Sequence, residues 1–182
     1  GARGIVGETM TEDVARRFAA AFGSYLRDLT KIDRATVLIG RDGRPSGEAL
    51  AAAAIEGFAD VGCDVIDIGV AATPTVGLMI GHRSAHGGLC ITASHNPMEW
   101  NGLKCLDANG LAPPPAQAAA IIERFKANRV DTVPPSKRGT RSDDLSSVRV
   151  HVEAVERLID RAPIRARGFR VALDSINASG CL

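Results

Sequence analysis

Residues 87–104, GGLCITASHNPMEWNGLK, join a short apolar run to an abrupt polar turn. The run GGLCITA has the length and composition of a buried strand. Asn96-Pro97 follows, and this pair favours a turn because the residue before a proline avoids the helical region. Residues 102–107, GLKCLD, alternate in polarity like a further strand. The stretch therefore predicts a strand that ends in a sharp turn, with Ser94 displayed at its tip.

Strand-like and helical patterns alternate on both sides of this stretch. Apolar runs at 35–40 and 63–69 are typical of buried strands. Apolar residues recur at helical spacing in four further ranges, which predict helices at 11–29, 46–61, 75–82 and 113–128. Thr11 and Ser46 are the expected N-caps of the first two helices. The alternation predicts an α/β fold: a three-layer αβα domain with a mostly parallel, mixed sheet.

The C-terminal part of the sequence predicts a second structural unit. Residues 131–147 are polar, contain Pro, Ser and Gly, and have no periodicity, so we expect a linker after a first domain at 1–130. A helical pattern at 146–162 and a strand-like run at 168–180 follow. Because a lone strand has no sheet to join, we interpret 148–182 as the truncated start of a second α/β domain.

The composition argues against several classes of partner. The net charge is +1 and aromatic residues make up 4% of the chain, so no nucleic-acid partner is expected. The apolar runs are far shorter than a membrane span, so no membrane association is expected. The cysteines are widely spaced and form no CxxC pair, which favours buried thiols in a reducing cytoplasm over a zinc site or disulfides. These cysteines are Cys63, Cys90, Cys105 and Cys181.

Reactive side chains are concentrated around the turn, at Ser94, His95, Asn96 and Lys104. Serine, histidine and asparagine are also common turn residues, so a purely structural turn in a non-catalytic α/β binding module is one alternative. A serine hydrolase is another, although no G-x-S-x-G surrounds Ser94 and neighbouring side chains such as Ser94 and His95 rarely face each other. The density of reactive groups on a strand–turn framework favours a functional site.

The motifs of the chain resemble those of the α-D-phosphohexomutases, which include phosphoglucomutase, phosphomannomutase and phosphoglucosamine mutase. The resemblance rests first on TASHNP at 92–97, with a lysine ten positions after the serine. GARG at 1–4, GRDGRPSG at 40–47, WNGLK at 100–104 and VALDSINASG at 171–180 match in family order. The resemblance therefore extends over nearly the whole chain.

The resemblance implies a role for each of four residues. Ser94 is similar to the family's serine that carries a phosphoryl group and passes it to the sugar. His95 is similar to the adjacent histidine that helps to position that group, and Lys104 to a lysine that transfers a proton or stabilises charge. Arg3 resembles the N-terminal arginine that reaches into the same site. Such cations suit the site because a phosphoserine carries about −1.5 to −2 charges at pH 7.

The loop GRDGRPSG at 40–47 lies between a predicted strand and a predicted helix. Such a place could bring Arg41 and Arg44 toward a phosphate at a helix N-terminus. We favour a structural role, in which Asp42 and Gly43 form the turn and Arg41 or Arg44 pairs with an acid.

The resemblance also implies an enzyme, an intramolecular phosphotransferase that moves a phosphoryl group between C1 and C6 of a hexose phosphate substrate. Its intermediate is a hexose 1,6-bisphosphate, which also serves as an activator. In the family, Mg²⁺ is bound by the phosphoserine and by an aspartate loop of a second domain, but no DxDxD occurs here. We therefore expect a cytoplasmic protein whose domains 2–4 are missing from this chain, and little activity from the chain alone.

Overall fold

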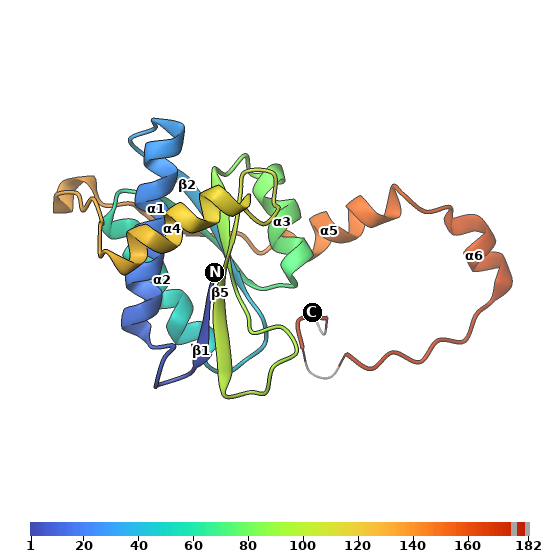
Figure 1. Cartoon of the computed structure of the whole chain (residues 1–182). Coiled ribbons are helices and arrows are strands. Elements are labelled where there is room, and N and C mark those ends of the chain that lie inside the picture. Colours follow the sequence, from blue (N-terminus) through green and yellow to red (C-terminus); the bar gives the residue numbers. More distant parts are fainter. Residues whose placement is uncertain (176–177, 181–182) are drawn as a thin grey trace.

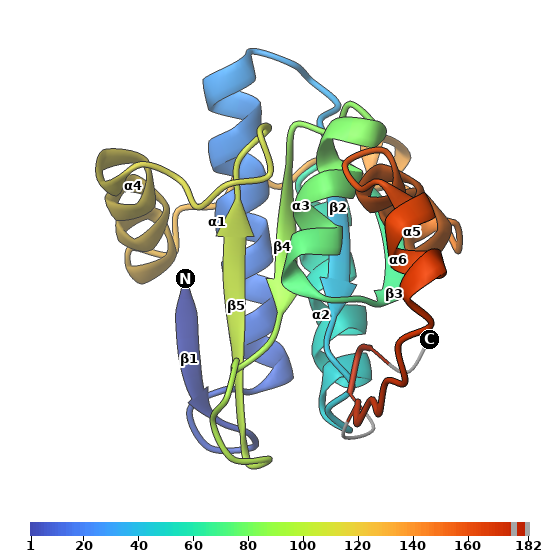
Figure 2. The same cartoon turned by 90° about the vertical axis from the view of Figure 1, so that its right-hand side faces the viewer.

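A six-stranded mixed sheet forms the centre of the computed structural model, which describes residues 1–175 and 178–180. The strand order is β1-β5-β4-β2-β3-β6, and β1, β5, β4, β2 and β3 follow one another from left to right in Figure 2. The strands are β1 (Ala2–Ile5), β2 (Thr36–Arg41), β3 (Asp64–Val70), β4 (Gly87–Ile91), β5 (Trp100–Leu106) and β6 (Arg141–Asp143). Strands β4, β2, β3 and β6 run parallel, whereas β5 is antiparallel to both of its neighbours. The sheet is therefore mostly parallel and mixed, as the sequence predicts.

Helices cover both faces of this sheet (Figure 2). Helices α1 (Glu12–Thr30) and α2 (Gly47–Asp60) lie on one face, and α4 (Pro115–Lys126) packs against α1. Helices α3 (Thr73–His82) and α5 (Ser147–Glu156) lie on the other face. Each face has its own buried apolar cluster, and burial of this apolar surface is the main stabilising term of the fold. The predicted α/β class and its three layers are confirmed.

The N-caps of the first two helices differ in what they bond. Thr11 caps α1 as predicted, because its Oγ1 accepts a hydrogen bond of 3.2 Å from the Val14 amide. Ser46 occupies the N-cap position of α2 but makes no capping bond with its side chain. Its hydroxyl instead accepts a 2.9 Å hydrogen bond from Nδ2 of Asn101, a fully buried residue of β5. Ser46 therefore ties the start of α2 to β5.

The segment predicted as an irregular linker, 131–147, is partly regular. It contains a short 3-10 helix (Pro135–Lys137) and strand β6, which pairs in parallel with β3. Asp64 of β3 holds this segment, since its Oδ1 accepts from both the amide and the hydroxyl of Thr140 at 2.8 Å. The linker prediction is therefore wrong at β6, where a side chain of β3 supplies the anchor. The domain division itself remains a prediction.

The helix predicted at 146–162 is two helices. Helix α5 ends at Glu156, and α6 (Arg161–Arg167) begins after Asp160, whose side chain accepts from the Ala162 amide at 3.0 Å. Pro163 has no amide hydrogen to offer to the preceding turn, so it fits the first turn of a new helix but not the interior of a long one. The cap and the proline together explain the break.

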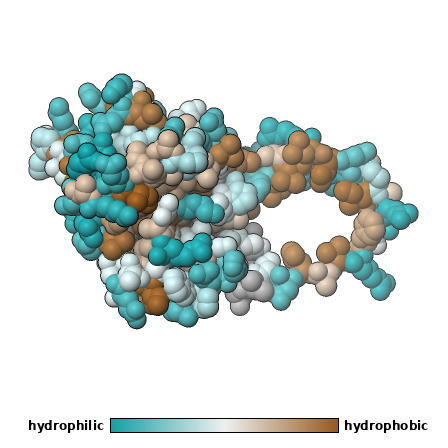
Figure 3. All heavy atoms as spheres, viewed as in Figure 1, coloured by the Kyte–Doolittle hydropathy of each residue, from teal (hydrophilic) through white to brown (hydrophobic). Residues whose placement is uncertain are grey.

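The strand predicted at 168–180 is not formed in the described residues. Residues 169–175 have no regular secondary structure, and residues 176 and 177 of the prediction lie outside the described residues. A strand needs a hydrogen-bonded neighbour, and residues 169–175 lie away from the sheet (Figure 1). Residues 157–175 form what we call the C-terminal arm, along which hydrophobic side chains are exposed (Figure 3).

Three of the four cysteines are buried free thiols, as predicted: Cys63, Cys90 and Cys105. Cys181 lies outside the described residues. Burial raises the pKa of both Cys63 and Cys105 to about 12, which makes these thiols unreactive at neutral pH. Across residues 1–175 and 178–180, none of the helices combines the length and the apolar character that a membrane crossing requires.

Candidate functional site

The polar turn after β4 is a loop with Ser94 at its tip. Residues 92–99, which we call the serine loop, connect β4 to antiparallel β5. Ser94 is exposed, and its φ of 60° is a left-handed conformation that is unfavourable for residues with a side chain. Backbone conformations of this kind concentrate at functional sites. The prediction that the turn displays Ser94 is confirmed.

Arg44, in the turn after β2, holds the serine loop by its main chain. Its guanidinium donates to four carbonyl oxygens, those of Ser94 at 3.0 Å, Asn96 at 2.7 Å, Pro97 at 2.6 Å and Trp100 at 3.2 Å. Its Nε donates to Oδ2 of Asp42 at 3.1 Å. The side chain is 10% exposed, so these bonds lie mostly out of contact with water. The predicted pairing of an arginine of this turn with an acid is confirmed.

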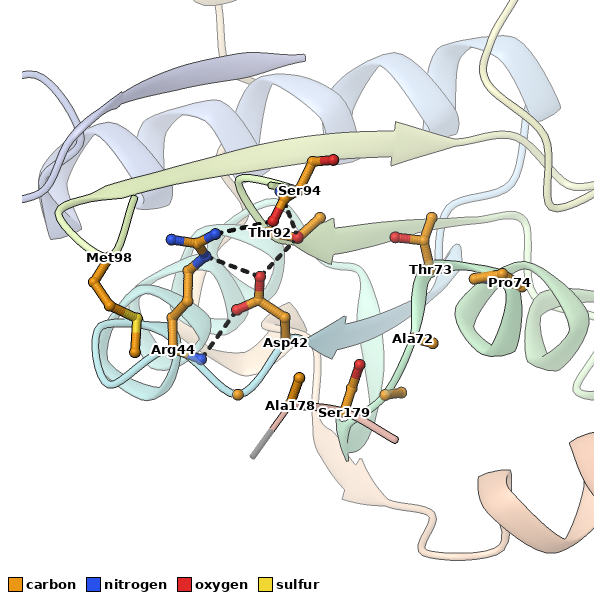
Figure 4. A pocket seen from close by; sticks show the side chains of 12 residues that line it. Asp42, Arg44, Ala72, Thr73, Pro74, Thr92, Ser94, Met98, Ala178 and Ser179 are labelled. Atoms are coloured by element: carbon orange, nitrogen blue, oxygen red, sulfur yellow. Dashed lines mark hydrogen bonds and ion pairs between the residues drawn. The ribbon is translucent and has the colours of Figure 1, made fainter. Parts of the chain in front are cut away.

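Asp42 and Thr92 extend the same network from below the loop (Figure 4). The Thr92 hydroxyl donates to Oδ2 of Asp42 at 2.7 Å and accepts from the Ser94 amide at 3.0 Å. The Asp42 amide in turn donates to the Ile91 carbonyl at the end of β4, at 3.0 Å. The left-handed conformation of Ser94 is therefore fixed on both sides: its carbonyl accepts from Arg44, and its amide donates to Thr92, which is bonded to Asp42.

His95 lies beside Ser94. Its Nδ1 is 3.4 Å from Oγ of Ser94, at the long end of the hydrogen-bond range, and both side chains are exposed. The expectation that these neighbours do not face each other is wrong, because the left-handed residue interrupts the alternation of an extended chain. Within the described residues, the main-chain N–H of His95 has no hydrogen-bond acceptor. The tip of the loop thus offers a hydroxyl, an imidazole and an amide.

Arg3 approaches the serine loop from the edge strand β1. Its Nη1 is 3.5 Å from Oδ1 of Asn96, and its register partner on β5 is Gly102. A Cβ on Gly102 would lie 2.9 Å from the carbonyl oxygens of both Ala2 and Thr92. Only glycine permits this close approach of three backbones, which carries β1 to within reach of the loop. The prediction that Arg3 reaches this region is consistent with its position.

Lys104 lies on β5, two residues beyond Gly102. It is exposed and pairs with Cys90 of β4, and directly opposite residues of antiparallel strands point to the same face. The Gly102 carbonyl accepts a hydrogen bond from the Thr92 amide, so Lys104 lies about 7 Å along the strand from the start of the serine loop. Burial raises the pKa of the Cys90 thiol, and the Thr73 hydroxyl and the Lys104 ammonium oppose that rise.

A hollow of about 340 Å³ opens beside the serine loop (Figure 4). It lies where β2, β3 and β4 end, and the helices that follow β2 and β3 go to opposite faces of the sheet. Ligands of open α/β sheets bind in crevices at such diverging carboxyl ends. Its polar lining comes from Asp42, Arg44, Thr73, Thr92, Ser94 and Ser179. In Figure 4 the Ser94 hydroxyl is directed away from Arg44.

The residues that the structure describes do not complete a metal site. Within the described residues, no group of three or more His, Cys, Asp or Glu side chains is arranged to hold a metal ion. Asp42, the carboxylate beside the loop, is bonded to Arg44 and Thr92. Because Mg²⁺ requires several converging oxygens, Ser94 with its surroundings is not a sufficient donor set.

Sequence reasoning missed what Arg44 and Asn101 contact. Arg44 was expected to bond an acid, but its four carbonyl contacts come from residues 50 to 56 positions later in the chain. Asn101 donates to Ser46, and its Oδ1 accepts from the Gly102 amide at 2.8 Å. The sequence signal for these contacts was that GRDGR and SHNPMEWNG each follow a predicted strand. This indicates two neighbouring turns but does not indicate which of their atoms are in contact.

Comparison with known proteins identifies the family. The family model described as phosphoglucomutase/phosphomannomutase, alpha/beta/alpha domain I, matches residues 1–131. This chain belongs to that family. A phosphoglucomutase/phosphomannomutase of Thermococcus kodakarensis is 37% identical over all of this chain and 40% of its own length. A probable phosphoglucosamine mutase of Methanopyrus kandleri is 39% identical over 97% of this chain and 37% of its own length.

Solved structures show the same relationship. A putative phosphomannomutase from Thermus thermophilus superposes with a TM-score of 0.74 and 28% identity, over 87% of this chain and 34% of its own. A phosphoglucomutase/phosphomannomutase family protein from Burkholderia thailandensis gives a TM-score of 0.71 and 29% identity, over 86% of this chain and 33% of its own. The chain therefore spans about 40% or less of the length of these relatives.

Proposed function

We propose that Ser94 carries the transferred phosphoryl group of a phosphohexose mutase. The observation that carries this proposal is the exposed, left-handed Ser94, fixed by its main chain between Arg44 and Thr92. Two cationic side chains, Arg3 and Lys104, lie on the adjoining strands. A rigid hydroxyl beside cations suits phosphoryl transfer, which depends on positioning and charge stabilisation more than on covalent chemistry by the protein.

The proposed reaction transfers the group twice. The O–P bond of phospho-Ser94 breaks as the free hydroxyl of a hexose monophosphate forms an O–P bond, so a hexose 1,6-bisphosphate results. The proton of the sugar hydroxyl leaves, and the Ser94 oxygen ends protonated. The bisphosphate then reorients in the site, and its other phosphoryl group is transferred back to Ser94. The net change moves phosphate between C1 and C6.

Three residues have proposed roles in this reaction. Arg3 binds phosphoryl oxygens with its guanidinium, which can contact two oxygens at once. Lys104 stabilises the developing charge and transfers a proton. His95, whose Nδ1 is 3.4 Å from the serine oxygen, orients the phosphoryl group. Removal of one well-placed donor from such a site costs about 10²–10³ in rate.

The metal ion and the remaining sugar contacts are proposed to come from outside this chain. Mg²⁺ is proposed to act in the full-length protein. There a phosphoryl group on Ser94 would supply one part of the set of oxygen ligands, which the described residues alone do not complete. Domains 2–4 are proposed to supply the other ligands and the sugar contacts. We therefore propose that residues 1–182 alone have little or no mutase activity. The reduced, buried Cys63 and Cys105 favour a cytoplasmic location.

Two alternatives receive no support from the fold or the comparisons. A hydrolase serine of the elbow type lies between a strand and a helix, whereas the serine loop connects β4 to the antiparallel strand β5. A binding module without catalysis would not require an exposed serine in a left-handed conformation. The mutase is therefore the function that we propose.

The test is phosphosite mapping on the full-length product of the gene. The protein is incubated with glucose 1,6-bisphosphate and Mg²⁺, and we expect a mass increase of about 80 Da, one phosphoryl group, on the peptide that contains Ser94. Ser94→Ala should show no increase, and Ser84→Ala, which alters another exposed serine with a positive φ, should leave it unchanged. An unmodified Ser94 in the wild-type protein would contradict the proposal.

The sugar preference and the fragment need separate assays. Isomerisation of glucose 1-phosphate, mannose 1-phosphate and glucosamine 1-phosphate by the full-length protein would identify the substrate. Residues 1–182 should be inactive in the same assays and should gain activity when the remaining domains are added. Full turnover by the chain alone would refute the proposal that further domains are required.

A further inference from the structure

We infer that Arg44 is a positioning residue that sets the direction of the serine loop's peptide groups, and that it is not a phosphate ligand. The inference rests on the proposed function of Ser94. A guanidinium has five N–H bonds: one on Nε and two on each Nη. Nε donates to Asp42, Nη1 to Pro97 and Trp100, and Nη2 to Ser94 and Asn96. The five N–H groups therefore have five acceptors, with no donor left for a ligand.

The charge of Arg44 is also accounted for within the network. The carboxylate of Asp42 lies 3.1 Å from Nε, and the two side chains are 10% and 20% exposed. Asp42 is fixed in its turn by the Thr92 hydroxyl at 2.7 Å and by the Arg44 amide at 3.1 Å. A buried, paired guanidinium with every donor engaged can affect a phosphoryl group only through the loop that it holds.

The direction of the Ser94 carbonyl determines the direction of the next amide. In a trans peptide the C=O and N–H bonds point in opposite directions. The Ser94 carbonyl points to Nη2 of Arg44, so the His95 N–H points away from Arg44. The Ser94 hydroxyl is also directed away from Arg44 (Figure 4). The His95 amide has no acceptor among the described residues, so it is open to an oxygen of a phosphoryl group on Ser94.

A lysine at position 44 cannot reproduce this arrangement. An ammonium has three N–H donors around one atom, whereas the acceptors here require a planar fork with five. Arg44→Lys keeps the positive charge near the loop but loses at least two of the five contacts. If the charge alone mattered, the variant would behave as the wild type does. If the fork positions the loop, the loop should become mobile and the reaction slow.

The first measurement needs no variant and uses the wild-type chain. Nitrogen-15 NMR of arginine side chains distinguishes a guanidinium with fixed N–H bonds from one that rotates freely. We expect Arg44 to give separate, slowly exchanging Nη hydrogen signals, in contrast to the exposed Arg17, whose Nε bonds Asp13. Averaged, rapidly exchanging Nη signals from Arg44 would overturn the inference even if every variant failed to fold.

The second measurement compares Arg44→Lys with Arg41→Lys. Arg41 is the last residue of β2, directly before this turn, and makes no side-chain hydrogen bond in the described part of the chain, so it is a matched control. In the wild type the Ser94 amide donates to the Thr92 hydroxyl and the Asn96 amide to the Ala93 carbonyl. In Arg44→Lys we expect faster hydrogen exchange of these two amides. Amides of β4 and β5 should stay protected. Equal loss of protection throughout the sheet would overturn the inference, because it indicates general destabilisation.

The third measurement uses the full-length protein and glucose 1,6-bisphosphate with Mg²⁺. We expect phosphoryl uptake by Ser94 to slow by about 10–100-fold in Arg44→Lys, with little change in the KM for the bisphosphate, since misplacement of a reacting group by about 1 Å can cost 10². Arg41→Lys should match the wild type. A wild-type rate in Arg44→Lys, or a large rise in KM alone, would overturn the inference.

The three measurements distinguish a failure of this inference from a failure of the proposed function. If wild-type Ser94 takes up no phosphoryl group, the proposed function fails, while the NMR and exchange results still decide whether Arg44 fixes the loop. If Ser94 is phosphorylated but Arg44→Lys leaves both exchange and rate unchanged, the inference fails and the proposed function stands.

Discussion

The serine loop and the part of the C-terminal arm that follows α6 both lack regular secondary structure, yet they differ in what fixes them. The serine loop is held by hydrogen bonds to Arg44 and Asp42 of another turn, and its own Thr92 hydroxyl links Asp42 to the Ser94 amide. The arm contains Val171 and Leu173, which are 82% and 84% exposed. An irregular backbone is therefore not by itself evidence of mobility, because long-range hydrogen bonds can fix the conformation of a loop as firmly as sheet hydrogen bonds fix a strand.

The largest difference between the two regions should appear on truncation of one leucine in each. Leu89 of β4 is fully buried, whereas Leu173 of the arm is 84% exposed. Leu89→Ala should lower the free energy of unfolding by about 2–5 kcal/mol, because it removes buried contacts and leaves a cavity. Leu173→Ala should change it by about 0.5 kcal/mol or less. Urea denaturation of both variants measures this, and equal effects would show that the arm is packed.

The next largest effect concerns the charge that pairs with Arg44. Asp42→Asn keeps the shape of the side chain but removes the negative charge from a pair that is mostly buried. We expect a loss of about 2 kcal/mol in the free energy of unfolding. Asp13→Asn is the control, because Asp13 pairs with Arg17 in an exposed i,i+4 bridge worth about 0.5 kcal/mol. A smaller loss for Asp42→Asn than for its control would indicate that the network does not hold the loop.

A third effect should appear only in acid. Hydrogen bonds from Arg34, with help from Thr140, lower the pKa of Asp64 to about 2 from an ordinary value of 3.8. A lowered folded-state pKa contributes stability above the ordinary value, and this contribution is lost as the pH falls from about 4 to about 2. Asp64→Asn should therefore flatten the stability curve over that range. Stability measured by urea unfolding at several pH values tests this, and an unchanged slope in the variant would contradict it.

The smallest effect concerns α5, which precedes the arm. Thr75 Oγ1 of α3 is 2.7 Å from Nδ1 of His151, and this contact fastens α5 to α3. Thr75→Val keeps the shape and should cost about 1 kcal/mol or less, the usual net value of one hydrogen bond. Hydrogen exchange should rise in α5 and remain unchanged in β2 and β4. A rise that includes the central strands would mean that α5 unfolds together with the domain.

The fold could be predicted from the sequence because its signals are local. Apolar runs and helical spacing gave β2, β3, β4, α1 and α2 to within a few residues, and Thr11 could be recognised as a cap. The strand predicted at 168–180 is not formed in the described residues, because strand formation there depends on a non-local partner. Its residues favour a strand, but a strand forms only with a neighbour, and sequence preference cannot supply one.

The candidate site was predictable in part. The positions of Ser94 and His95 in one turn follow from the chain itself, and Arg3 was placed near them through the family resemblance. The left-handed φ of Ser94 and the contacts of Arg44 were not predicted, because they depend on which carbonyls face a distant turn. Atom-level pairing between segments about 50 residues apart is set by packing of β2 beside β4.

The contacts of Arg44 with carbonyl oxygens have a consequence for how this loop can change. Every amino acid has a carbonyl, so the side chains at 95, 96 and 98 could be exchanged without removing a single acceptor from the guanidinium. The shape of the loop and the identity of its side chains are thus separate variables. Substitutions at the tip of the loop can therefore introduce new side chains while the backbone conformation that presents them stays the same.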